Sequence, residues 1–438
     1  MLDILKHLYT RIPSSRIPFL KQIPDRFLFG RSYDQTCINE KLDRIESDLW
    51  KALQYTRQHT EYGRTYMRKQ FLPSDSFRVL QDLPLVSSSD LSENLEFYQS
   101  DTCNKNNSYL TSTGGTGRNP TSIRLSNSSF GIEWKHMHFI WGTCGYQRKQ
   151  HLKLTFRGVR LRSKRLTQYN PLYNELMVDS FRLTQANFKT FIQEIAPYRI
   201  RFIHGYPSLL REFMDMCTAH KFSLELNGIF LGSENIYPGE KEVLSDFFHC
   251  KVIAWYGQSE KVVLAYDPVM DNRYRVFTSY GYPRIINPDL NGYGEISGTT
   301  FVNPALPLVN YCTGDYGKLQ EFEGTFILTE ITGRWGKDFV YLNKEKKIPT
   351  TSINIHSAVQ REILFYQIHQ SEFGILQIKI LPKRTTNWSE AEIIKGIEKD
   401  LGSKLPDFII HYRIIDDEKE LVRSHRGKMI MMVQNLKQ

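Results

Sequence analysis

The sequence predicts an α/β protein with a large N-terminal domain and a small α+β domain at the C-terminal end. Three observations indicate this. Apolar runs of strand length alternate with helical segments between residues 199 and 260, a pattern typical of parallel strands joined by helices. From about residue 290 the chain is rich in Gly, Thr, Val and Tyr, as β-hairpins are. Beyond Gly333, strand and helix patterns recur over the length of one compact unit.

The alternating segment contains three expected strands and two expected helices. Pro207 and Pro238 stand where the helices begin, a position that tolerates the missing proline N–H. The strands are RIRFIHGY, NGIFLGSE and KVIAWYGQSE, and the helices are PSLLREFMDMCTAHK and PGEKEVLSDFFHC. The expected hairpin strands that follow are GYGEISGTTFV, PLVNYCTGDYGKL and GTFILTEITGR.

The last hundred residues read as a separate unit. Strands are expected at KDFVYLN, GILQIKIL and FIIHYRII, and a helix at SEAEIIKGIEKDLGSKL. We place the boundary between Gly333 and Asp338, which gives a large domain of residues 1–333 and a small, mobile one of residues 334–438. The apolar face of the expected helix consists of Ile393, Ile394, Ile397 and Leu401.

Composition favours a soluble cytoplasmic protein. Hydrophobic residues make up 40% and charged residues 24%, which excludes a disordered chain. The net charge of +10 comes from basic residues spread along the chain, so small anions suit it at least as well as nucleic acid or an acidic membrane. The six cysteines are widely spaced and form no Cys-x-x-Cys, so we expect reduced thiols and no zinc.

The N-terminal segment MLDILKHLYTRIPSSRIPFLKQIP has neither a signal-like apolar stretch nor a membrane span. Leu2, Leu5, Tyr9 and Ile12 could line one face of a short helix. Packing of this helix against the protein is the favoured interpretation, with peripheral membrane contact as the alternative.

A Gly- and Thr-rich stretch, TSTGGTGRNP, lies between two hydrophobic segments. Glycines let backbone N–H groups converge and hydroxyls add donors, so residues 112–117 could wrap a polyphosphate. The stretch is not a Walker A motif, since no Gly-Lys-Ser/Thr follows. The alternative is a polar hairpin turn. The residues concerned are Ser112, Thr113, Gly114, Gly115, Thr116 and Gly117.

Four further segments carry candidate site residues. WYGQSE, from Trp255 to Glu260, ends an apolar run, where a ligand of an open α/β sheet is expected, although Ser259 or Glu260 could instead cap a helix. YCTGDYG places Asp315 on a tight turn, able to bind two adjacent hydroxyls or to serve as a β-turn residue. TGRWGKD and SHRGKM each set a Gly beside a cation, either as a phosphate contact or as a solvated turn.

In this order, the five segments resemble the motifs of the adenylate-forming superfamily of acyl-CoA synthetases. They are most similar to the branch related to phenylacetate–CoA ligase, which includes proteins of bacterial capsule and O-antigen clusters. TSTGGTGRNP resembles the family's phosphate loop, YGQSE its Tyr-Gly-x-Thr-Glu with Ser for Thr, and YCTGD its Tyr-x-Thr-Gly-Asp. Gly333-Arg334 leading to Asp338 resembles the family hinge, and Gly427-Lys428 its late Gly-Lys.

The resemblance implies the following nucleotide site. Residues 112–117 would hold the β- and γ-phosphates of ATP, and Asp315 would bind the ribose with Arg334 nearby. Ser259 would meet the α-phosphate and Glu260 would bind Mg²⁺. Lys428 would swing in on the small domain about Asp338 and bridge the carboxylate and the α-phosphate. Residues that would flank adenine are Gly232, Ser233, Glu234, Tyr256 and Gly257.

The segment FGIEWKHMHFIWGTCGYQRK is expected to line the acyl pocket, with packing aromatics as the alternative. The chain departs from many relatives in two places. IPTTSINIHSAV lacks the Glu that they carry near His356, and their zinc-binding insertion is missing between Glu260 and Gly294. The acyl-pocket candidates are Trp134, His138, Trp141 and His204, and His136 lies among them in the sequence.

The leading hypothesis is therefore an ATP-dependent, AMP-forming carboxylate ligase that then passes the acyl group to a nucleophile. Surface-polysaccharide biosynthesis, with an amide formed between a sugar acid and an amine, is the expected setting. One alternative is an aryl- or acyl-CoA ligase with CoA as acceptor. Others are a nucleotide binder without catalytic activity and a basic nucleic-acid-binding protein, although clustered basic-aromatic segments are missing.

Overall fold

The computed structural model describes residues 22–112, 122–157, 159, 161, 163–234, 236, 239–333, 339–344, 347–349, 353, 359, 362–384, 386–402, 405–423 and 430–436. The short helix expected over residues 2–12 lies outside these ranges, and so does most of the Gly- and Thr-rich stretch. Within them, no helix is long and apolar enough to cross a membrane.

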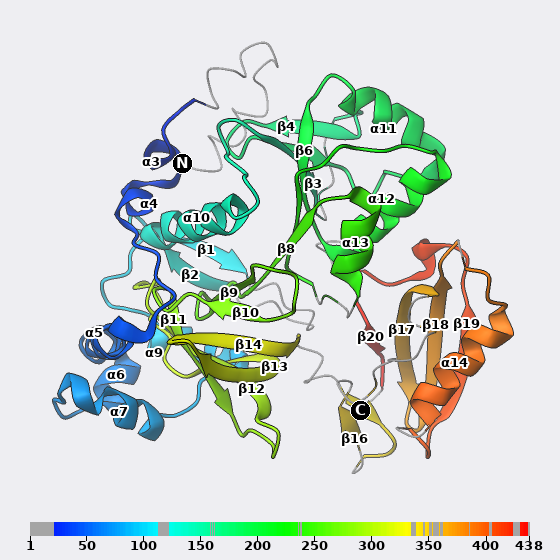
Figure 1. Cartoon of the computed structure of the whole chain (residues 1–438). Helices are drawn as coiled ribbons and strands as arrows, with labels where there is room; N and C mark the ends of the chain where they lie inside the picture. The colour runs from blue at the N-terminus through cyan, green and yellow to red at the C-terminus, as the bar shows by residue number, and fades with distance from the viewer. Residues whose placement is uncertain are drawn as a thin grey trace.

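A mixed sheet forms the centre of the large domain (Figure 1). In the described residues it has twelve strands in the order β11-β12-β13-β14-β10-β9-β8-β7-β6-β3-β5-β4. Strands β8, β7, β6, β3 and β5 are parallel neighbours, as the alternating pattern predicts. They are β3 (Leu152–Phe156), β5 (Glu175–Val178), β6 (Ile200–Gly205), β7 (Gly228–Leu231) and β8 (Lys251–Gly257).

The expected hairpins join this same sheet rather than forming a separate one. β9 runs antiparallel to β8 and connects the parallel strands to the hairpins through β10 and β14. Local sequence patterns do not specify which strand an edge will pair with, so this continuity could not be predicted. The strands are β4 (Thr167–Asn170), β9 (Leu264–Asp267), β10 (Tyr274–Val276), β11 (Gly281–Ile286), β12 (Tyr293–Thr300), β13 (Tyr311–Phe322) and β14 (Thr325–Thr332).

The parallel strands are covered on both faces (Figure 1). One face packs against α11, α12 and α13, and its core includes Leu154, Phe156, Ile203 and Leu231. The opposite face packs against α10, in an aromatic core that includes Phe202 and Phe230. Because side chains alternate along a strand, neighbouring residues of one strand enter different cores. The helices are α10 (Asn127–Gly142), α11 (Phe188–Ile195), α12 (Pro207–Ala219) and α13 (Glu240–Phe248).

Short helices and one hairpin make up the N-terminal part of the described chain. Leu49 and Leu53 of α5 are fully buried in the larger core. The hairpin pairs Ser112 of β1 with Ser122 of β2. The elements are α3 (Asp25–Phe29), α4 (Arg31–Gln35), α5 (Ile45–His59), α6 (Glu61–Tyr66), α7 (Ser76–Asp82), α8 (Ser88–Glu93), α9 (Leu95–Tyr98), β1 (Ser108–Ser112) and β2 (Ser122–Ser126).

The C-terminal residues form a second sheet with its own core. In the described part this sheet has four strands in the order β19-β18-β17-β20. Ile393, Ile397 and Leu401 of α14 are buried in its core, as expected from their spacing. The elements are β15 (Phe339–Tyr341), β16 (Lys347–Pro349), β17 (Ile363–Glu372), β18 (Ile375–Pro382), α14 (Glu390–Gly402), β19 (Ile409–Ile414) and β20 (Met432–Gln434).

An ion pair joins the C-terminal unit to α12 of the large domain. Arg423 contacts Glu212 of α12 and lies 3.3 Å from Glu418 of its own unit. The expected boundary residues 334–338 lie outside the described ranges, so the division at residue 333 stays a prediction.

Candidate active site

The carboxyl ends of neighbouring parallel strands bring several candidate residues to one edge of the sheet. His204 lies at the end of β6, Gly232 directly follows β7, and Tyr256 and Gly257 end β8. Ligands of open α/β sheets bind at this edge, because the loops that follow the strands meet there. The local sequence thus puts the candidate residues where a ligand is expected.

Tyr256 and Asp315 come together although they belong to distant strands. The Tyr256 hydroxyl donates a hydrogen bond of 3.0 Å to Oδ2 of Asp315. Three strands separate β8 from β13 in the sheet, a span of about 19 Å in a flat sheet with strands ~4.8 Å apart. The sheet must therefore curl strongly between β8 and β13, and this curl brings the two residues together.

Asp315 lies within strand β13 and not on the tight turn expected from the sequence, and its surroundings hold its carboxylate and the backbone beside it. Burial, together with the Asp315 carboxylate, raises the pKa of Tyr256 well above its usual value, so the phenol stays protonated and acts as the donor. The Asp315 backbone N–H donates to Oγ1 of Thr313 at 3.1 Å, and the Gly314 N–H donates to Glu295 at 2.9 Å. Gly314 has φ of 76°, a conformation that glycine adopts without strain.

Glu260 is fully buried in the segment that follows β8. Tyr311 donates a hydrogen bond of 2.8 Å to its Oε1. The next residue, Lys261, has φ of 61° and forms an ion pair with Glu133 of α10. Ser259 is half-buried beside them. The alternative in which Ser259 or Glu260 caps a helix is not what the structure has, since no helix begins there in the described chain.

The segment after β7 is held close to Trp255. A Cβ on Gly232 would stand 2.4 Å from Cε2 of Trp255, so any side chain there would displace the indole. Ser233 has φ of 70°. The Glu234 carboxylate accepts hydrogen bonds of 3.1 Å from both the backbone N–H and the hydroxyl of Ser208. Glu234 thereby caps the amino end of α12.

Several expected site residues lie outside the described ranges. Of the Gly- and Thr-rich stretch, only the backbone of Ser112 is described, at the end of β1. The stretch joins two antiparallel strands, which both the polyphosphate loop and the polar turn would do. The residues outside are Thr113, Gly114, Gly115, Thr116, Gly117, Arg334, Asp338, His356 and Lys428.

The four acyl-pocket candidates belong to one aromatic cluster. Trp141 is almost fully buried, and its ring centroid lies 5.4 Å from that of His204 and 5.8 Å from that of Trp134. Trp134 also stacks on Tyr173 at 4.5 Å. His138 bonds through Nδ1 to the Tyr33 hydroxyl at 2.8 Å. These contacts are those of packed aromatic side chains, and they equally form a ring-binding wall beside the strand ends.

Buried histidines in this cluster are neutral. Burial, with the nearby charges of Arg157 and Lys153, lowers the pKa of His204 well below its usual value. Burial also lowers the pKa of His138 to about 3 and that of His136 to about 4. A neutral imidazole offers one donor and one acceptor, so these rings can bond to ligands or neighbours without adding charge.

Three polar residues beside the aromatic cluster were missed from the sequence. Lys153 is fully buried and lies 3.5 Å from Glu175 of β5, which also lies 3.3 Å from Arg157. Burial lowers the pKa of Lys153 to about 8, against the opposing effect of Glu175. The available signal was the strand LKLTFR, in which polar residues alternate with apolar ones on a strand otherwise expected to be buried.

The described residues include no cluster of three or more His, Cys, Asp or Glu side chains placed to hold a metal ion. Mg²⁺ in nucleotide sites is typically held by one or two carboxylates together with phosphate oxygens. Glu260 has the right chemistry for such a ligand, and its Oε1 is positioned by Tyr311. The residues present therefore fit a nucleotide-bound Mg²⁺.

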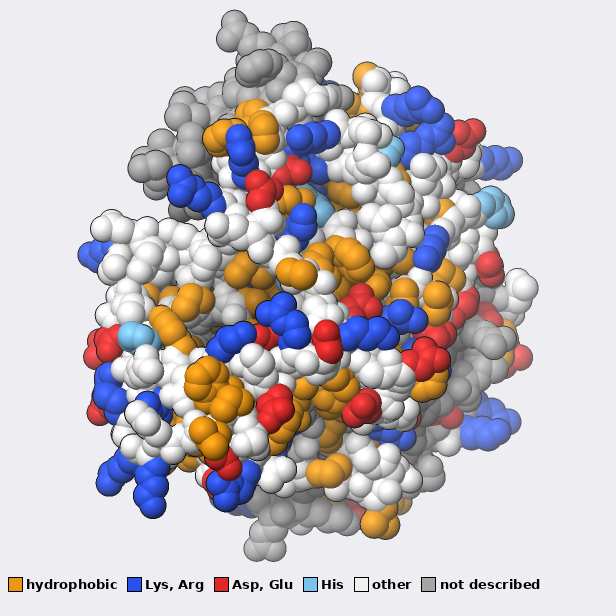
Figure 2. Space-filling model, turned by 60° about the vertical axis from the view of Figure 1, so that its left-hand side comes forward, with side chains coloured by type: hydrophobic (Ala, Val, Ile, Leu, Met, Phe, Trp, Pro, Cys, Tyr) orange, Lys and Arg blue, Asp and Glu red, His pale blue; other side chains and the backbone are white. Residues whose placement is uncertain are grey.

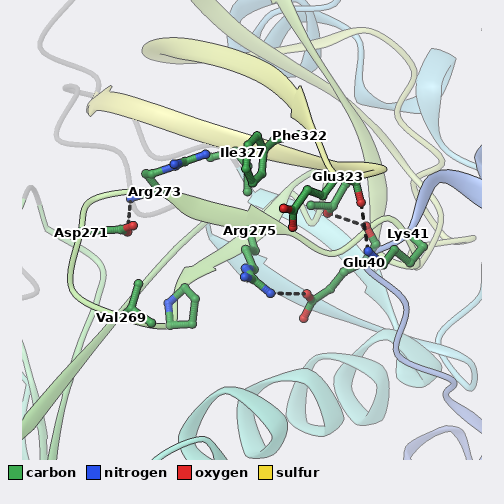
Figure 3. Close-up of a pocket in the computed structure, with 11 residues that line it drawn as sticks. Glu40, Lys41, Val269, Asp271, Arg273, Arg275, Phe322, Glu323 and Ile327 are labelled. Atoms are coloured by element: carbon green, nitrogen blue, oxygen red, sulfur yellow. Dashed lines mark hydrogen bonds and ion pairs between the residues drawn. The ribbon is translucent and has the colours of Figure 1, made fainter.

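A surface hollow lies away from these residues (Figure 3). It measures about 160 Å³ and is lined by cationic and anionic side chains, among them Lys41, Arg275 and Glu323. Its wall includes Pro268 and Val269, which follow β9. Because β9 is antiparallel to β8, this hollow faces the amino end of β8 and not the end that carries Tyr256.

Basic residues on the surface are interspersed with acidic ones. Figure 2 shows Lys and Arg side chains scattered among Asp and Glu over one face of the molecule. A protein that binds nucleic acid along this face would concentrate its positive charge there. The face drawn therefore gives the nucleic-acid alternative no support.

The fold is shared with solved structures of adenylate-forming ligases, which confirms the predicted fold class. 2-Hydroxyisobutyryl-CoA ligase in the postadenylation state matches with a TM-score of 0.62 at 14% identity, covering 89% of this chain and 88% of that one. The GH3.15 acyl acid amido synthetase matches with 0.58 at 13% identity, covering 86% and 87%. The anthranilate CoA ligase AuaEII in complex with anthranoyl-AMP matches with 0.50 at 12%, covering 82% and 74%.

No protein-family model matches the sequence, and a comparison with curated protein sequences gave no significant match.

Proposed function

We propose that this protein is an ATP-dependent, AMP-forming carboxylate ligase. The observation that carries the proposal is the contact between Tyr256 and Asp315. These residues stand in two separate motifs and come together at the carboxyl edge of a sheet whose fold is shared with adenylate-forming ligases. Asp315 would bind the ribose hydroxyls, and Tyr256 would hold that carboxylate and flank adenine with Gly232 and Gly257.

The first half-reaction joins two anions, so it needs positive charge. A carboxylate oxygen attacks the α-phosphorus of ATP, the bond to the bridging oxygen breaks, and pyrophosphate leaves. Lys428, Arg334 and the donors of residues 112–117 would offset the negative charge that develops. Mg²⁺, when bound by Glu260 and the phosphates, would supply further positive charge. Ser259 would donate to the α-phosphate.

The acyl-adenylate then passes its acyl group to a nucleophile. The neighbours include both CoA ligases and an amido synthetase, so an amine and CoA are both reasonable acceptors. We favour amide formation in surface-polysaccharide synthesis, in keeping with the resemblance to the phenylacetate–CoA ligase branch. Turnover that depends on an amine and not on CoA would support this choice. Turnover that needs CoA would support the alternative.

The test of adenylation is exchange of labelled pyrophosphate into ATP, measured with aromatic acids, amino acids, sugar acids and dicarboxylic acids. We expect exchange that depends on one class of acid. Lys428→Ala should reduce it on the order of 10²-fold or more. Lys419→Ala is the matched control, because Lys419 belongs to the same C-terminal unit and its side chain is 78% exposed. Exchange without any acid, or equal loss in both variants, would contradict the proposal.

A further inference from the structure

Four polar atoms around Trp141 are buried and have no hydrogen-bond partner among the described residues. They are Nε1 of Trp141, the hydroxyl of Tyr146, Nδ1 of His204 and Nε of Arg157. The rings of Tyr146 and His204 lie 5.6 and 5.4 Å from that of Trp141. Most buried polar groups in native proteins are bonded. Two of the four, Nε1 of Trp141 and Nε of Arg157, can only donate, and the other two can donate. A group of such atoms in one place therefore points to a ligand rich in oxygen acceptors.

The same place carries one positive charge in excess among its described residues. Lys153 and Arg157 share a single carboxylate, Glu175. That carboxylate also accepts hydrogen bonds of 2.9 Å from Thr155 and 3.1 Å from Asn170. One carboxylate neutralises one of the two cations, and the Arg157 side chain, which is 34% exposed, can be reached from outside the core. An anionic ligand would balance the second.

Of the two cations, Arg157 has an N–H group left to bind that ligand. Its Nη2 faces Glu175, whereas Nε is unpaired. Lys153, by contrast, donates to the Tyr173 carbonyl at 2.9 Å and lies against Trp141 and Tyr146. A guanidinium binds a carboxylate through two parallel N–H donors. Lys153 and Glu175 would then act as positioning residues behind Arg157.

Arg157 and His204 lie at the far end of the proposed acyl site. Thr155 of β3 pairs with His204 of β6, so Arg157 emerges beside that histidine at the same edge of the sheet. Three strand spacings, or about 14 Å, separate β3 from β8, where the adenylated carboxylate would lie. The ring of Trp255 bridges part of this span, 5.3 Å from His204. The side chains at both ends and their hydrogen bonds take up part of this span, and the remainder accommodates a substituted ring or a chain of about six carbons.

We propose that Arg157 and His204 bind a second carboxylate of the substrate, which makes the acid that is adenylated a dicarboxylic acid. The inference rests on the proposed function, because it names the substrate of the same site. Arg157 would bind the distal carboxylate through Nε and an adjacent Nη, and His204 would donate from Nδ1. The aromatic rings of Trp141 and Trp255 would contact the body of the acid between its two ends.

The experiment compares acids that differ only in the distal group. The probes are 4-(carboxymethyl)benzoate against 4-carbamoylphenylacetate and 4-(hydroxymethyl)phenylacetate, and adipate against its monoamide. In pyrophosphate exchange we expect the dicarboxylate of at least one set to have a kcat/KM roughly 10- to 100-fold above its amide, the range for a charge-assisted hydrogen bond. Exchange with the amide that equals or exceeds exchange with the dicarboxylate in both sets would overturn the inference alone.

Substitutions then test which side chains cause the preference for the dicarboxylate over its amide. Arg157→Gln should reduce the preference to less than about 5-fold while exchange with the amide persists, which also shows that the variant is folded. His204→Gln should reduce it by a smaller factor. Arg201→Gln is the matched control, because Arg201 lies near the amino end of β6 and pairs with Glu225. A preference that survives Arg157→Gln unchanged would overturn the assignment.

Calorimetric titration of the wild-type protein with the same acids separates this inference from the proposed function. Tighter binding of a dicarboxylate than of its amide, lost in Arg157→Gln, would uphold the distal site even if no acid supports exchange. In that case adenylation would be refuted and the binding site retained. Exchange supported only by monocarboxylic acids would have the opposite meaning, with adenylation upheld and the distal site refuted.

Discussion

The two faces of the parallel strands in the central sheet have different compositions, although the same strands supply both. The face under α11, α12 and α13 is built mainly from aliphatic and Phe side chains, and Lys241 of α13 is buried there in an ion pair with Asp267 of β9. The face under α10 combines aromatic rings with a buried Lys, a buried Glu and neutral histidines. Buried polar groups cost free energy unless they are paired, and each face has a buried ion pair. The α10 face differs in that it gathers aromatic rings, neutral histidines and two cations around one carboxylate, which is the arrangement that the proposed ligand site uses.

The largest expected effect is on the packing face. Phe213 of α12 is fully buried, and its ring lies 4.7 Å from that of Phe156. Phe213→Ala should lower the free energy of unfolding by about 4 kcal/mol through lost burial and the cavity left behind. Urea unfolding measures this loss. The preference between acids should not change, and a changed preference would break the distinction between the two faces.

The next effect is on the polar group of the α10 face. Lys153→Met leaves Glu175 without one of its two cations, which should cost about 3 kcal/mol, at the low end for a broken buried ion pair because Arg157 remains. Adding Glu175→Leu to the same chain should recover part of that stability, since no unpaired carboxylate is then left. If the double variant were less stable than the single one, the polar group would be stabilising in its own right, contrary to a ligand-binding role.

Acid should weaken the α10 face through its histidines. Burial holds the pKa of His136 at about 4, below that of an exposed histidine, near 6.5. The stability from the neutral ring is fully present above pH 6.5 and is lost as the pH falls from 6.5 towards 4. At pH 5.5 the loss for this one residue should be about 1 kcal/mol. His136→Asn should have a correspondingly shallower fall in unfolding free energy between pH 7 and 5.5, and an unchanged slope would contradict the neutral buried ring.

The smallest effect concerns the contact of the packing face with the C-terminal unit. Glu212→Gln removes the carboxylate that pairs with Arg423 of that unit, and we expect pyrophosphate exchange to fall only a few-fold, because Arg423 keeps a second partner in Glu418, 3.3 Å away. The relative preference for different acids should stay the same. Glu225→Gln, which alters an exposed pair, provides the control. A shift in acid preference would show that α12 also influences the acyl site.

Much of the architecture could be predicted because it follows from local pattern. The strands around Ile203, Ile229 and Ile253 were expected from their apolar runs, and the helix with Ile393 from its spacing. The continuity of the sheet was missed, since strand pairing between β8 and β9 depends on partners rather than on local sequence. The curl of the sheet, which brings Tyr256 to Asp315, could not be predicted for the same reason.

The candidate site likewise contains residues that were predicted from the sequence and residues that were missed. Trp141 and His204 were expected near the acyl group, and they contact one another. Lys153 and Glu175 were missed because their pairing joins two parallel strands that are connected by a long crossover. A lysine in a short strand reads from sequence as a solvent-facing residue. Only the three-dimensional arrangement shows that its charge is buried.

The most direct test of adenylation is the fate of one carboxylate oxygen of the acid. The accepted acid, labelled with ¹⁸O in its carboxylate, is incubated with ATP, Mg²⁺, the protein and hydroxylamine as the acyl acceptor, and the products are analysed by mass spectrometry. Attack of the carboxylate on the α-phosphorus leaves one labelled oxygen in AMP when the acyl group departs. We predict AMP with one ¹⁸O and unlabelled pyrophosphate. Label in inorganic phosphate alongside ADP, or AMP without label, would contradict adenylation of the carboxylate.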